Sequence, residues 1–121
     1  MTGRLLQEAQ EGLQTIEFIG DEAASVYNRI CRLMKNTDLP DVIYLGEHKE
    51  PEIASTVTYH IGDSTVYFSS WFDSDNPVKV NELEISIASP NPEYRQKSLL
   101  RLEQILGIKL NIGEVPAVIA G

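Results

Sequence analysis

The stretch from Ile53 to Phe72 constrains the fold more than any other part of the chain. Apolar and polar residues alternate on both sides of Gly62 and Asp63, and this period of two is typical of two strands that each bury one face. A turn of two residues and a turn of four residues both place the apolar residues of the two strands on the same face, because the two lengths differ by an even number of residues. We therefore predict a hairpin whose buried face holds Val57, Tyr59, Ile61, Val66 and Phe68.

The opposite face of this hairpin mixes hydroxyl groups, one histidine and two aromatic rings: Thr56, Thr58, His60, Thr65, Tyr67, Ser69 and Trp71. Aromatic residues with a polar tip are enriched in protein interfaces, where they supply contact area and a hydrogen bond. Two interpretations of Tyr67 and Trp71 stay open, contact with a partner and burial under a helix of the same chain.

Length and composition favour one soluble domain spanning residues 1–121. Hydrophobic residues at 42% and charged residues at 23% are near globular averages and argue against intrinsic disorder. Cys31 is the only cysteine, so no internal disulfide forms, as suits a reducing compartment. No segment has the ~20 apolar residues of a membrane span, and residues 1–14 lack the apolar core of a secretory signal. We expect a cytoplasmic protein that does not enter membranes.

The net charge of −8 is concentrated in the middle of the chain. Residues 41–91 hold two lysines and nine acidic residues, a net charge of −7. Such a field repels phosphate, which disfavours direct binding of nucleic acid or anionic membranes, and it attracts a basic protein. Solubility alone also explains an acidic surface.

The N-terminal region has apolar or small residues at alternating spacings of three and four from Leu6 to Met34, which predicts helix. An unbroken helix from Gly3 to Lys35 would be about 50 Å long, beyond the roughly 35 Å diameter of a domain this size. Gly20 offers a break, with Asp21 capping a second helix. We favour helix on both sides of Gly20, while a short strand at Thr15 to Ile19 stays an alternative.

The remaining elements follow from local signals. In order, we predict a short strand at Val42 to Leu45, a polar loop at Gly46 to Glu52 and a turn at Asp73 to Pro77. The next strand either bulges near Asn81 or begins after it. A helix from Asn91 to Gly107, a short strand at Lys109 to Ile112 and an apolar tail at 113–121 follow. The fold class is α+β: an N-terminal helix or helix pair, an antiparallel sheet of four to five strands, and a C-terminal helix packed on the sheet.

Motifs for catalysis or metal binding are weak. Asp73-Ser74-Asp75-Asn76 begins like a calcium loop, but of the later positions that define an EF-hand only Glu84 matches, so a solvated turn is the better interpretation. Cys31 and His60 could form a catalytic pair of thiolate and imidazole only if the thiol were partly exposed. Cys31 sits in mid-helix beside an apolar stripe, where a small buried thiol is the usual finding. His48 and His60 lack a third ligand for zinc. We expect no catalytic residue, no metal and no cofactor.

Two hypotheses for function remain. The first is a non-catalytic interaction or regulatory module, a homodimer whose acidic outer sheet face binds a basic protein or the basic helix residues of a second copy, Arg29, Arg32, Arg95 and Arg101. Its predicted binding residues are Tyr67, Trp71, Asp73, Asp75, Glu82 and Glu84. The second is a small-ligand-binding protein or minor enzyme with a pocket between sheet and helices, lined by Tyr27, Cys31, Tyr59 and His60.

Overall fold

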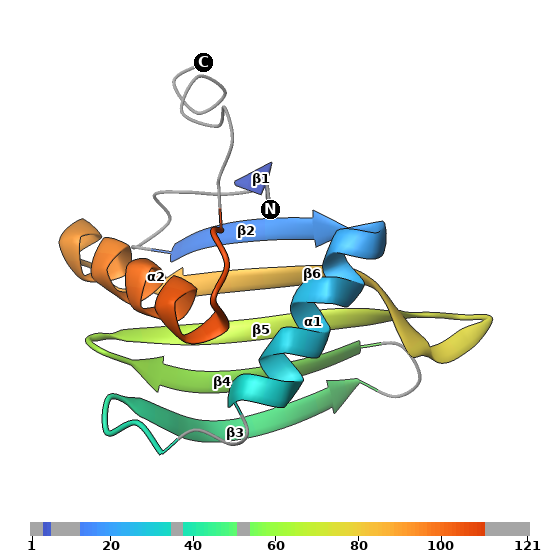
Figure 1. The fold of residues 1–121 in the computed structure, drawn as a ribbon, viewed down its shortest axis with the longest axis horizontal. Coiled ribbons are helices and arrows are strands. Elements are labelled where there is room, and N and C mark those ends of the chain that lie inside the picture. The colour runs from blue at the N-terminus through green and yellow to red at the C-terminus, as the bar shows by residue number, and fades with distance from the viewer. Residues whose placement is uncertain (1–3, 6–12, 35–37, 51–53, 111–121) are drawn as a thin grey trace.

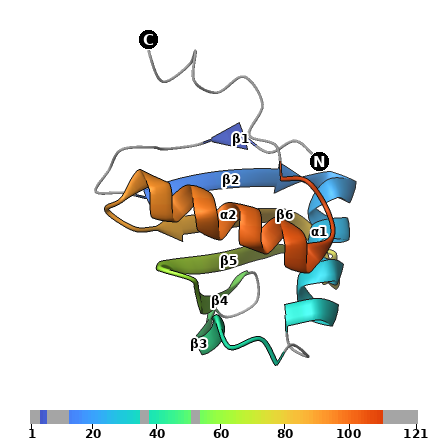
Figure 2. The ribbon, with the colours of Figure 1, turned by 60° about the vertical axis from the view of Figure 1, so that its left-hand side comes forward.

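An antiparallel sheet carries two helices on one of its faces (Figure 1). The computed structural model describes residues 4–5, 13–34, 38–50 and 54–110, and in these ranges the sheet has six strands in the order β1-β2-β6-β5-β4-β3. The strands are Arg4–Leu5 (β1), Leu13–Ile19 (β2), Val42–Glu50 (β3), Ala54–Ile61 (β4), Ser64–Asp73 (β5) and Asn76–Ala88 (β6), and the helices are Gly20–Met34 (α1) and Pro92–Leu106 (α2). The rotated view also shows α1 and α2 on the same side of the sheet (Figure 2). The α+β class is confirmed; five of the strands are long, and β1 has only two residues.

Strands β4 and β5 form the predicted hairpin. Ile61 pairs with Ser64, so the turn is the two residues Gly62 and Asp63, and Gly62 adopts the positive φ of +60° that this tight reversal requires. The pairing continues without a shift to Ala54 opposite Trp71. Side chains of the predicted buried face point toward the helices, and Phe68 is only 3% exposed. The sequence alternation therefore identified the buried side of the hairpin.

Strand β6 contains the predicted irregularity near Asn81. Trp71 pairs with Glu82 while the next residue, Phe72, pairs with Val80, which leaves Asn81 as an extra residue. The bulge lets Val80 and Leu83 both be buried although their positions differ in parity. Glu82 and Glu84 consequently share the face turned away from the helices.

The predicted helix before Gly20 is wrong where the structure describes it. Residues 13–19 form strand β2, which pairs along its whole length with β6. Thr15, Ile16 and Phe18 are β-branched or aromatic, which favours a strand, and the alternation buries Ile16 and Phe18 completely or nearly so. Gly20 has a φ of +64° and joins β2 directly to α1. Residues 13–19 fit both the helical spacing of three and four and the strand spacing of two, and their pairing with β6 makes them a strand.

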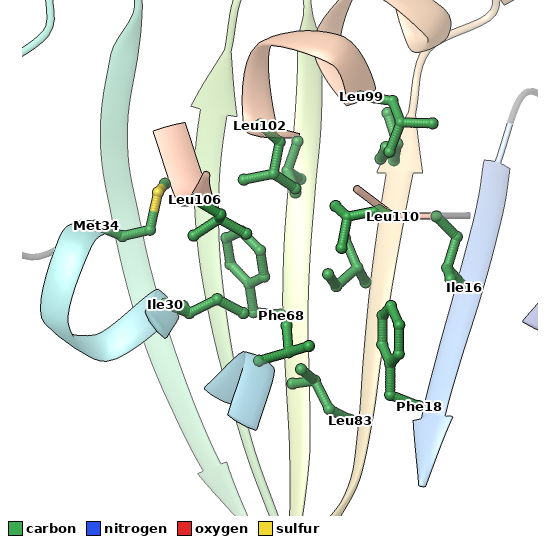
Figure 3. Close-up of a cluster of buried hydrophobic side chains, with 14 of the residues drawn as sticks. Ile16, Phe18, Ile30, Met34, Phe68, Leu83, Leu99, Leu102, Leu106 and Leu110 are labelled. Carbon is green, nitrogen blue, oxygen red and sulfur yellow. The ribbon is translucent and has the colours of Figure 1, made fainter. Parts of the chain in front are cut away.

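The hydrophobic core lies between the sheet and both helices. Figure 3 shows side chains of α1 and α2, among them Ile30, Met34 and Leu102, meeting Phe68 and Leu83 of the sheet. The α2 termini are as predicted: the Asn91 side chain accepts a hydrogen bond from the Glu93 amide, and Gly107 ends the helix with a left-handed φ of +71°. Leu100 of α2 is 46% exposed.

Two further segments differ from the prediction. Residues 47–50, expected in a loop, extend β3 beyond a bulge at Gly46, whose φ of +144° only glycine adopts easily. Lys109 and Leu110, expected to start a strand, are not in one; Leu110 turns inward and is 2% exposed, and its amide donates to Glu103 Oε2 at 2.6 Å. Residues 111–121, with the predicted apolar tail, lie outside the described residues, as do most of residues 1–12.

Because Phe68 faces the core and Tyr67 faces away from it, truncation of these two adjacent residues should destabilise the protein to different extents. Phe68→Ala removes a ring packed against Tyr59 at a centroid distance of 5.8 Å, and a buried Phe→Ala change costs about 3–5 kcal/mol of unfolding free energy. Tyr67→Ala, on the other face, should cost less than half of that. Urea unfolding of both variants measures the difference; equal losses would contradict the facing.

Candidate functional site

The sheet surface opposite the two helices is the largest feature of the structure that no described element covers. We call it the open face; it consists of alternate residues of the five long strands, including Thr15, Glu17, Glu82, Glu84, Ser86, Thr65, Tyr67, Ser69, Trp71, Thr56, Thr58, His60 and His48. Most of these side chains are half-buried, because neighbouring strands flank them while nothing among the described residues lies on top.

Tyr67 and Trp71 lie on β5, which has two long strands on each side. Tyr67 is opposite Ser86 on β6 and Thr58 on β4, while Trp71 is opposite Glu82 and Ala54. Both rings are half-buried among these smaller neighbours. Burial under a helix, the other interpretation of this pair, does not occur: α1 and α2 are on the far side (Figures 1 and 2).

Hydroxyl groups bond to one another across the strands of the open face. Thr15 Oγ1 and Ser86 Oγ are 2.9 Å apart, and Thr56 Oγ1 and Ser69 Oγ are 3.1 Å apart. Cross-strand hydroxyl pairs of this kind help to fix strand register.

Three carboxylates meet on β2 and β6. Glu17, Glu82 and Glu84 bring oxygen atoms within 4.8 Å of one another. Burial, and after it the charge of Glu17, raises the pKa of Glu84 above its ordinary value. This acidic trio has ligand atoms suited to a metal ion or a lysine or arginine head group, and any such cation would relieve the repulsion. Among the described residues it is also the one group with metal-ligand spacing.

The six predicted partner-binding residues are distributed unevenly. Tyr67, Trp71, Glu82 and Glu84 share the open face. Asp73 lies at the end of β5, and Asp75 lies in the β5-β6 turn, where its amide donates to Asp73 Oδ1 at 2.9 Å. These two residues thus shape a turn at the edge of the face.

Glu17 was missed by the sequence prediction, because residues 13–19 were expected to be helical. The alternation of Thr15, Ile16, Glu17 and Phe18 was the signal that would have placed its carboxylate beside Glu84.

A small cavity lies between α1 and the sheet. Its volume is about 40 Å³, and its lining includes Tyr27, Cys31 and Tyr59 of the predicted pocket. His60 is a correction: it alternates with the buried Tyr59 and Ile61 and therefore lies on the open face, on the other side of the sheet from Cys31. Ligand pockets typically measure about 300–1,000 Å³, whereas this space suits a few water molecules at roughly 10–15 Å³ each.

The two tyrosines that line the cavity do not ionise at neutral pH. Burial, a hydrogen bond with Cys31 and the nearby charge of Glu47 raise the pKa of Tyr27 to about 12. Burial likewise raises the pKa of Tyr59. Both phenols therefore stay protonated under physiological conditions, and the cysteine and histidine considered for catalysis are separated by the sheet.

All four basic residues expected to meet a second copy interact within the chain. Arg29 Nη1 donates to the Leu106 carbonyl at 2.9 Å, and Arg95, only 6% exposed, donates to the Ser89 carbonyl at 2.6 Å. Arg101 forms two hydrogen bonds with Asp41, at 2.7 and 3.2 Å, which lower the pKa of that carboxyl group. Arg32 is exposed and is also engaged in an interaction within the chain.

Comparison with known proteins found no matching family model, no matching curated protein and no matching solved structure. Neither helix of the described part of the chain has the length and apolarity to cross a membrane. Function is therefore inferred from the surfaces of the molecule alone.

The pKa of Glu84 offers a direct check of the acidic trio. Glu17→Gln should lower it, because one of its two causes is the charge of Glu17, and should leave part of the elevation, because burial is the larger cause. Titration of the Glu84 side-chain carbon by NMR measures the shift. An unchanged Glu84 pKa in the variant would show that the two carboxylates do not interact.

The same elevation has a consequence for stability. A carboxyl group with a raised pKa in the folded state favours folding below its unfolded pKa, and this contribution is lost as the pH rises through the folded value. Glu84→Gln should therefore raise the urea midpoint at neutral pH and lose this advantage below about pH 4, where glutamate is largely protonated in both states. A variant that is less stable than the parent at neutral pH would contradict the sign.

Proposed function

We propose that this protein is a non-catalytic interaction module that binds another protein surface through the open face, either a second copy of itself or a basic protein. The observation that carries the proposal is the pair Tyr67 and Trp71, half-buried on the central long strand of a sheet face that no described element covers. Aromatic side chains with a polar tip are enriched among the anchors of protein interfaces.

The charge of the face narrows the class of partner. Glu17, Glu82 and Glu84 gather on one side of the aromatic pair, and the chain carries a net charge of −8. A cationic group docked at the acidic trio would gain from this field, while nucleic acid would be repelled. The expected partner is therefore a protein surface whose positive charge meets the acidic trio while a neighbouring part of it contacts Tyr67 and Trp71.

The cavity between α1 and the sheet is too small for the alternative function, binding of a small organic ligand. About 40 Å³ between Tyr27, Cys31 and Tyr59 is several times below what a metabolite needs. The same space has room for no more than a few water molecules.

The single tryptophan of the chain reports directly on this proposal, since Trp71 is on the face itself. Its emission should shift to shorter wavelength when the face is covered. We expect the shift either on raising the protein concentration from low to high micromolar or on adding an oligolysine peptide. Emission that stays unchanged in both titrations would contradict the proposal.

A matched pair of variants separates the face from the rest of the surface. Trp71→Ala should weaken the association by roughly tenfold or more, because truncating a central aromatic anchor typically costs over 1 kcal/mol of binding free energy. Tyr94→Ala removes a ring that is 40% exposed on α2, on the opposite side of the molecule, and should leave association unchanged. Sedimentation velocity measures both. Equal effects would place the interface elsewhere.

A further inference from the structure

The charges of the open face are segregated across the sheet. One cross-strand row runs through all five long strands in the order Glu17, Glu84, Ser69, Thr56 and His48. It begins with two carboxylates on β2 and β6 and ends with an imidazole on β3. The centre of the row is the hydrogen-bonded pair of Ser69 and Thr56.

The chain has only two histidines, and both lie on the half of the open face away from the acidic trio. His48 is on β3 and His60 on β4, whereas the acidic trio is on β2 and β6. Other ionisable residues lie near both ends of the row. Glu17 has Glu82 and Glu84 beside it on β6 and Arg4 opposite in register on β1; His48 has the uncharged Thr56 opposite and Glu50 two residues along its own strand.

We infer that the occupant of the open face is a second copy of this chain, related by a twofold axis along β5, with the acidic half of each face against the histidine half of the other. The inference rests on the proposed function and names its partner. A rotation of 180° about an axis along the central strand exchanges β6 with β4 and β2 with β3. Glu17 of each copy then lies over the partner's His48.

Apolar contacts support the same arrangement. The row that contains Thr65 ends in Leu13 on β2 and in Ile43 on β3, which is 51% exposed, so the twofold axis brings these apolar ends together. Tyr67 and Trp71 lie next to the axis and meet their own counterparts. Packed sheets cross at about 30°, which preserves this correspondence best near β5 and shifts the outer strands, with Glu17 and the partner's His48, by roughly 5 Å along their length.

The size of the face fits a dimer. Five strands about 4.8 Å apart with about seven residues each, at about 3.4 Å per residue, make a surface of roughly 24 by 24 Å. The resulting planar area of roughly 600 Å², increased by side-chain relief, approaches the ~800 Å² per partner of standard stable interfaces.

The competing twofold arrangement is unfavourable. An axis within the face but across the strands would superpose β6 on β6 and β2 on β2, so the acidic side of one copy would lie over the acidic side of the other.

Dimer strength should depend on pH. A protonated imidazole is attracted to a carboxylate opposite it and a neutral imidazole is not, so acidification should strengthen the contact between Glu17 and the partner's His48. We expect the dissociation constant to rise by about tenfold from pH 6 to pH 8. Sedimentation velocity at both pH values measures this change, and a dimer whose strength is independent of pH would overturn the pairing of Glu17 with His48.

Charge exchange between two variants tests the twofold arrangement itself. Glu17→Lys places a lysine against the partner's histidine, and His48→Glu places a glutamate against the partner's native glutamate, so each variant alone should be mostly monomeric. A mixture should form heterodimers, because one of the two contacts then joins the introduced lysine to the introduced glutamate and the other is the native pair. A mixture that stays monomeric, with both variants folded by circular dichroism, would overturn the arrangement.

Failure of this inference is distinguishable from failure of the proposed function. A parent protein that is monomeric at high micromolar concentration at both pH values, but whose Trp71 emission shifts on adding oligolysine, overturns the second copy and supports a basic partner on the same face. Trp71→Lys, which puts charge at the axis, should abolish the dimer without unfolding the monomer. An intact dimer in this variant would overturn the inference.

Discussion

The pairing of β5 with β4 on one side and β6 on the other is the constraint on which the rest of the structure depends. β5 has two long strands on each side, so its alternation decides which side chains of the whole sheet are dry. Val66 and Phe68 are buried against the helices, and Tyr67 and Trp71 point the other way. A shift of one residue would reverse every side chain, and the bulge at Asn81 confines the change of parity in β6 to residues 76–80.

Two helices are enough to cover one face of this sheet, and the fold has no third described layer. α1 and α2 meet over the middle of the sheet, where Ile30 and Leu106 join the core. The other face is left with hydroxyl pairs, two aromatic rings, an acidic trio and both histidines. A surface with two aromatic rings on its central long strand and with charge on one side matches the proposed recognition of a protein.

The parts of the fold that could be predicted were those fixed by neighbouring residues. The Gly62 turn, the Asn91 cap, the Gly107 end and the facing of Phe68 each follow from a local rule. Residues 13–19 satisfied helical and strand periods together, and only their long-range pairing with β6 decided. Glu17 was missed for the same reason, because its place on the sheet depends on the pairing with β6. His60 alternates with Tyr59, so the sequence already indicated that it faces away from the pocket.

Hydroxyl-radical footprinting, read residue by residue by mass spectrometry, tests the division of the sheet into two faces most directly. At the lowest protein concentration Tyr67 and Trp71 should be oxidised readily while Phe18 and Phe68 are protected, and oxidation of the first two should fall as a partner covers them. Protection of Trp71 at every concentration, or oxidation of Phe68 at a comparable rate, would contradict the facing from which the interaction surface is inferred.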